Sequence, residues 1–136
     1  PRLDPRELDA VEGEISARIG NASAALGELD GDALRAEREG LVRLRLRAER
    51  LRLPTAAWEV RAGLLAALDA TADGFGAAAA AVDLQREAQT AGFDPVRGKE
   101  IVDRSVRSME LCRRRLEDAL AELGRVHEAR AKLEGR

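Results

Sequence analysis

Residues 94–134 read DPVRGKEIVDRSVRSMELCRRRLEDALAELGRVHEARAKLE, and this stretch decides the fold class. The Asp-Pro pair at its start can cap a helix and occupy the first helical position, where a missing N–H costs nothing. Apolar or small residues then recur at alternating steps of three and four, which is the spacing of one helix face. The spacing predicts a single helix over 95–134, about 40 residues or roughly 60 Å long.

The apolar positions of this helix follow a nearly strict heptad, which is typical of a helix that packs along its length on another helix. Its members are Val102, Ser105, Met109, Cys112, Leu116, Ala119, Leu123, Val126 and, after a break at Arg130, Leu133.

Three further helices are expected upstream of this one. Asp4-Pro5 repeats the start signal and begins a helix over about 5–29, and Asp32 can cap a second one over 33–53, which Pro54 ends. A third helix is expected over 56–90, followed by a turn at residues 91–95. Two alternatives stay open: a kink at Gly74, and a strand over 42–48, where apolar residues alternate with arginine.

The composition supports an all-α protein. The chain has 136 residues, of which 45% are hydrophobic, 35% charged and only 2% aromatic, so the core must be aliphatic and rich in alanine. The charge of successive helices alternates between acidic and basic, which favours packing of neighbours in the chain. We therefore expect one domain over 1–136, a four-helix up-and-down bundle made of a shorter hairpin and a longer, coiled-coil-like hairpin.

The chain shows no signal-peptide pattern, and its most apolar stretch contains Asp69 and Asp73, so we expect a cytoplasmic protein without a membrane span. All but two of its 23 basic residues are arginines, which indicates a GC-rich bacterial source. The net charge of −2 disfavours a general nucleic-acid binder.

No catalytic or metal site is expected, and no cofactor. His127 is the only histidine, and Gly124 stands where a metal-binding bundle would need a glutamate three residues earlier. We expect His127 to lie on the solvated surface. Cys112 is the only cysteine, and its heptad position predicts a buried thiol rather than a nucleophile. The protein is expected not to be an enzyme, and no small-molecule substrate is evident.

The expected function is therefore protein–protein interaction through helices, as an adaptor, a chaperone-like protein or a self-associating coiled coil, with a homodimer or a helical partner. Helix 33–53 has a second apolar face, and the last helix has a long seam. The candidate partner-binding residues are Val42, Leu46, Leu53, Trp58, Met109, Leu116, Leu123 and Val126.

Two other functions remain as alternatives. The first is binding of nucleic acid or another anionic surface through Arg43, Arg45, Arg47, Arg50 and Arg52. The second is a secreted helical-hairpin effector, and it comes from Trp58. We expect Trp58 in core packing at the junction of the hairpins, or else as an anchor for a partner. Trp58 near a turn resembles the Trp-x-Gly of the WXG100 family of secreted helical hairpins, although Val60 replaces the glycine and the chain has no tyrosine for that family's export motif.

Overall fold

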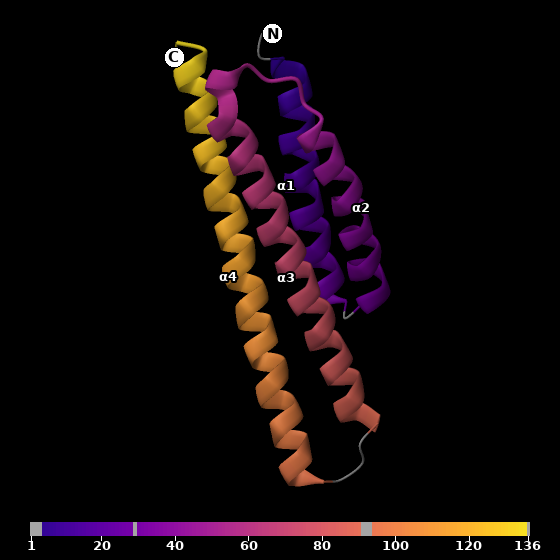
Figure 1. Cartoon of the computed structure of the whole chain (residues 1–136). Helices are drawn as coiled ribbons and strands as arrows, with labels where there is room; N and C mark the ends of the chain where they lie inside the picture. Colours follow the sequence, from indigo (N-terminus) through magenta and orange to yellow (C-terminus); the bar gives the residue numbers. More distant parts are fainter. Residues whose placement is uncertain (1–3, 29, 91–93, 136) are drawn as a thin grey trace.

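The computed structural model describes residues 4–28, 30–90 and 94–135. This part of the chain forms α1 (Pro5–Gly27), α2 (Gly31–Glu49), a 3-10 turn η1 (Thr55–Ala57), α3 (Trp58–Thr90) and α4 (Pro95–Leu133), and it contains no strand. Figure 1 shows a long hairpin of α3 and α4, with the shorter hairpin of α1 and α2 beside α3. The all-α prediction is confirmed. Leu29 and the predicted turn residues 91–93 lie outside the described residues.

Two helices begin at an Asp-Pro pair, as predicted. The Asp4 carboxylate accepts hydrogen bonds from the backbone N–H groups of Arg6 and Glu7, at 3.0 and 3.5 Å. Asp94 accepts from Val96 and Arg97 in the same way, at 3.1 and 3.3 Å. Each cap satisfies two of the N–H groups that a helix start leaves without partners.

The prediction for the start of α2 is wrong by two residues. Asp30 caps this helix by accepting from the backbone N–H of Ala33 at 3.0 Å, so Asp32 lies in the first turn instead of at the cap. Either aspartate has the right side chain, and the sequence alone does not distinguish them.

The end of α2 was also predicted too late, since the helix stops at Glu49 and not at Leu53. Leu51 turns into the core, and Arg61 donates a hydrogen bond to its carbonyl oxygen. The residue before a proline disfavours the helical conformation, so the chain reaches Pro54 extended. Residues 42–48 are helical, which excludes the strand alternative.

The core is a single cluster of aliphatic residues in which α3 is central. One face of α3 packs on α1 and α2, and an adjacent face packs on α4. The largest fully buried side chains from the four helices include Leu8, Ile15, Leu34, Leu44, Leu64, Phe75 and Val126. Because α4 pairs mainly with α3, the four helices do not share the core equally.

Small residues let α3 and α4 approach closely. A Cβ added to Gly63 would lie 2.5 Å from Cγ2 of Val126, and one added to Gly74 would lie 2.9 Å from Cδ2 of Leu116. Both distances are shorter than ordinary contacts, so a side chain at either position would force Val126 or Leu116 to move. α3 runs without interruption through Gly74, so the kink alternative is excluded, and the close approach of α4 accounts for that glycine.

Ion pairs join each helix to the next. Between α2 and α3, Arg35 pairs with Asp83 and Arg45 with Asp69, so the residue number rises on one helix as it falls on the other, and the two helices run antiparallel. The pairs between α1 and α2 and between α3 and α4 follow the same order. The closest atoms lie 2.8 Å apart for Arg18–Glu37, 2.6 Å for Arg47–Glu14, 2.8 Å for Arg35–Asp83 and 2.8 Å for Arg115–Asp73. Most of these side chains are exposed, and an exposed pair contributes only tenths of a kcal/mol, so they fix the alignment of the helices more than the stability.

Arg130 is the exception, because its side chain is only 7% exposed. Its Nη1 lies 2.8 Å from Oδ1 of Asp9 and 3.1 Å from Oε1 of Glu12, which ties the end of α4 to the start of α1. Burial acts to lower the pKa of Arg130, but its hydrogen bonds to Asp9 and Glu12 outweigh this and raise it. The guanidinium therefore stays charged.

One segment, Thr55–Thr90, is long and apolar enough to cross a membrane by length and composition, with a mean hydropathy of 1.2 in its most apolar window. Of that window, 56% is buried inside the molecule. A core helix passes the same test, so this segment is weak evidence for a membrane span.

Replacing Gly63 tests the close approach of α3 and α4. We expect Gly63→Ala to lower the free energy of unfolding by about 1–2 kcal/mol, because overpacking outweighs the gain in helix propensity. The matched control is Gly124→Ala, where no atom lies within 4 Å of the added Cβ and about 1 kcal/mol of stabilisation is expected. Urea unfolding followed by circular dichroism measures both. Equal stabilisation by the two variants would contradict the packing.

Replacing Arg130 tests the connection between α1 and α4. We expect Arg130→Met to destabilise the protein by about 1–3 kcal/mol, because it removes charged hydrogen bonds at a buried position. Arg125→Met is the control: among the described residues Arg125 pairs only with Glu122 of its own helix, and it is exposed, so a change within about 0.5 kcal/mol is expected. A double-mutant cycle with Glu12→Gln should show coupling, and additivity would contradict the ion pair.

Candidate interaction surface

The residues that could carry chemistry are not brought together. Among the described residues, no group of three His, Cys, Asp or Glu side chains could hold a metal ion. His127 is exposed, as predicted. Cys112 is buried, also as predicted, and burial raises the pKa of its thiol, which keeps it protonated. The features that remain as a candidate site are the apolar side chains exposed on the surface.

The heptad seam predicted for α4 consists of two adjacent rows. Ser105, Cys112, Ala119 and Val126 form the first row; all are buried, and their positions in α4 point them at α3. The second row, which we call the shoulder row, consists of Val102, Met109, Leu116, Leu123 and Arg130, again seven residues apart. Val126 is fully buried, so its assignment to a partner-binding surface is wrong: it fills the space opposite Gly63.

Coverage of the shoulder row changes along α4. Arg130 is buried against α1, and Leu123 and Leu116 are half-buried beside the core. Met109 is 38% exposed and Val102 is 53% exposed. The row thus starts at the interface with α1 and becomes free toward the turn between α3 and α4.

The uncovered end of this row forms an apolar surface. We define the distal apolar patch as Val102, Val106 and Met109 of α4, with Gln85 and Ala88 of α3 beside them. Together with Ile101 and Ser105 these residues line an open hollow of about 200 Å³ in which no side chain is charged. Val106 is 54% exposed. This is the end of the long hairpin that extends past α1 and α2 in Figure 1.

The opposite side of the α3–α4 contact is polar. Arg115 follows Cys112 by three residues and Leu116 follows it by four, so they fall on opposite sides of the buried row. On the side of Arg115, ion pairs join the helices: Arg115 to Asp73 at 2.8 Å and Arg97 to Glu87 at 3.3 Å. The hairpin therefore has one side closed by ion pairs and one side that is apolar and open.

The candidates on and after α2 do not form one surface with the distal apolar patch. Val42 and Leu46 are exposed on the outside of α2, whereas Leu41, Leu44 and Ala48 face the core. Leu53 is half-buried in the connection after α2. The second apolar stripe expected on this helix is thus only two residues long.

The arginines of the same segment are only partly available to an anion. Arg45 pairs with Asp69 and Glu49, and Arg47 pairs with Glu14. Arg43, Arg50 and Arg52 are exposed and make no ion pair with another described residue. Since two of the five candidates already have partners, the charge that α2 offers to a polyanion is small.

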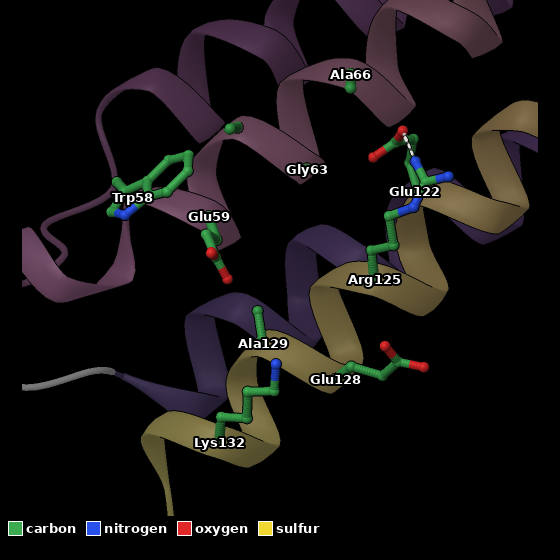
Figure 2. A pocket seen from close by; sticks show the side chains of 10 residues that line it. Trp58, Glu59, Gly63, Ala66, Glu122, Arg125, Glu128, Ala129 and Lys132 are labelled. Carbon is green, nitrogen blue, oxygen red and sulfur yellow. Dashed lines mark hydrogen bonds and ion pairs between the residues drawn. The ribbon is translucent and has the colours of Figure 1, made fainter.

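Trp58 is 67% exposed, so the expectation that it packs in the core is wrong. It lies at the first turn of α3 and, with Glu59, lines one side of a hollow of about 470 Å³ whose other side belongs to α4 (Figure 2). Lys132, Arg125, Glu122 and Glu128 line it as well, so a partner would have to displace water from several charges.

Sequence reasoning missed Val106 and Leu120, which are both about half exposed. Together with Val102, Met109, Leu116 and Leu123 they make a second three–four repeat, displaced by one position from the residues that face α3. Two overlapping repeats on one helix predict two neighbours, and this signal was present in the sequence.

Labelling of Cys112 tests its burial. We expect the native thiol to react with Ellman's reagent at pH 8 much more slowly than the urea-unfolded thiol, by at least about a hundredfold, because only transient opening exposes it. A native rate close to the unfolded rate would place Cys112 on the surface, and would require a different contact between α3 and α4.

Comparison with protein-family models, with curated proteins and with solved structures gave no match. The resemblance to the WXG100 family therefore still rests on Trp58 alone.

Proposed function

We propose that the chain is a non-enzymatic protein–protein interaction module of the cytoplasm, an adaptor-like helical protein that receives a partner helix on its distal apolar patch. The observation that carries this proposal is the loss of cover along the shoulder row. Arg130 and Leu123 have α1 or the core beside them, whereas Val102 and Met109 continue the same row and are 53% and 38% exposed.

The energetics favour an interaction of modest strength. Val102, Val106 and Met109 are each about half exposed, and burying the rest of each side chain contributes about 1 kcal/mol. Association itself costs at least about 4 kcal/mol in lost translational and rotational freedom. The patch alone does not hold a partner tightly, so we expect reversible binding in which the partner adds apolar residues of its own.

The distal apolar patch is favoured over the hollow at Trp58 for a physical reason. A partner at the patch displaces water from apolar atoms only, whereas one beside Trp58 must also desolvate Glu59, Arg125 or Lys132. The free-energy cost of desolvating a charge is larger than the free energy gained by burying a half-exposed apolar side chain, unless the charge is paired again.

Photo-crosslinking from the patch tests the proposal. With p-benzoylphenylalanine in place of Val106, we expect crosslinked adducts in cells of the source organism. The matched control is the same replacement at Leu111, which is 47% exposed on the same helix but one residue before Cys112 and so on the side of α4 away from the patch. Adducts from position 106 and not from 111 support the proposal. Equal yields from both positions, or none from 106, would contradict it.

A further inference from the structure

We propose that the occupant of the distal apolar patch is a second copy of this chain, whose α4 packs antiparallel on the first with the twofold axis between Val102 and Val106. The proposal rests on the proposed function and names its partner.

The apolar residues fit this arrangement. When two helices pack along their length, their contact residues recur at steps of three and four and meet in successive layers. In an antiparallel pair, a residue before the twofold axis on one helix meets a residue after the axis on the other. With the axis between Val102 and Val106, Val102 of each copy meets Val106 of the other. Both residues are more than half exposed in the single chain. The twofold axis makes the contact between Val102 and Val106 form twice, so four valines become buried in the dimer.

The charges beside the patch are complementary in the same alignment. Lys99 is exposed and makes no ion pair with any described residue, and this alignment sets it opposite Glu110 of the second copy. Asp103 lies close to the axis, where Arg107 of the second copy faces it; neither is paired within the described part of the chain. These charges sum to zero and occur in both copies, so each attraction is made twice.

Glu110 can accept this contact without losing its own. It already pairs with Arg113 at 2.9 Å, and a carboxylate has several acceptor positions. Arg113 also pairs with Glu117 at 2.8 Å, so the helix offers two glutamates with the same internal partner. Only Glu110 lies opposite Lys99 in the proposed alignment, and this difference supplies the control.

The fold leaves room for a second copy. Arg35, near the start of α2, pairs with Asp83 at 2.8 Å, and Ser105 of α4 donates to the carbonyl oxygen of Ala81 at 3.3 Å. The short hairpin therefore ends at about the level of Ser105, and α4 before that residue projects beyond it (Figure 1). The shoulder row, which α1 covers at the level of Arg130, continues here without cover.

Charge exchange between copies tests the alignment. Sedimentation and light scattering of the purified chain should show a dimer that forms at a concentration on the order of tens of micromolar. Lys99→Glu and Glu110→Lys should each weaken it by about tenfold, because two attractions become two repulsions. An equimolar mixture of the two single variants should recover the wild-type affinity, since each then meets the opposite charge.

Glu117→Lys is the matched control, because it removes the same internal pair with Arg113 outside the aligned region. It should leave dimerisation unchanged. A loss as large as that of Glu110→Lys, or failure of the mixture to recover, would overturn the alignment. A wild-type chain that stays monomeric at about 1 mM would overturn the second copy as partner.

The crosslinks then separate the two proposals. A monomeric chain that still gives adducts with another protein from position 106 keeps the proposed function and rejects the second copy. A monomeric chain without adducts rejects both. Adducts of twice the chain mass, formed by the purified protein, support both.

Discussion

The close contact between α3 and α4 is the constraint on which the rest of the structure depends. Gly63 opposite Val126 and Gly74 opposite Leu116 let the two helices approach so closely that an added Cβ would force the opposite side chain to move. Contact at this distance leaves only a narrow row of α4 facing α3, so the residues one position further around the helix fall on its shoulders. The residues on these two sides of α4 then decide which surfaces the protein offers to other molecules.

The two sides of the contact between α3 and α4 differ because the two hairpins differ in length. On one side, Arg115 and Arg97 reach acidic residues of α3, and the contact is complete within the chain. On the other side, Arg130 of the shoulder row pairs with Asp9 and Glu12 of α1, and Leu123 and Leu116 are half-buried beside the core. α1 and α2 end near the level of Ser105, so Val102 and Val106 have only α3 beside them in the described part of the chain and stay more than half exposed.

Helices with strong local signals could be predicted from the sequence. Asp-Pro pairs begin α1 and α4 because their caps depend only on neighbouring residues. The end of α2 could not be predicted, since Leu51 leaves the helix to reach the core, and its partner Arg61 is ten residues away. Trp58 could not be placed either, because an exposed and a buried tryptophan at a helix start have the same local sequence.

The candidate surface was predicted only in part, for a geometric reason. The two apolar positions of a heptad are three and four residues apart, so they lie about 60° from each other around an α-helix, and one predicted seam occupies two neighbouring rows. Met109 and Val126 belong to one heptad by their spacing. In the structure Met109 lies in the shoulder row and Val126 lies in the core. Spacing identifies a helix with neighbours, but the packing decides which row each neighbour covers.

Exposed valines on α4 are difficult to explain by folding alone. Valine is a poorer helix former than alanine or leucine because its branched side chain loses rotamer freedom, and that cost is usually offset by burial. Val102 and Val106 are more than half exposed, so the single chain offsets little of it. Lys99, Asp103 and Arg107 beside them likewise have no ion pair among the described residues. Apolar and charged groups that gain nothing in the isolated chain gain most where a second helix of matching charge covers them, and the antiparallel copy of α4 is such a helix.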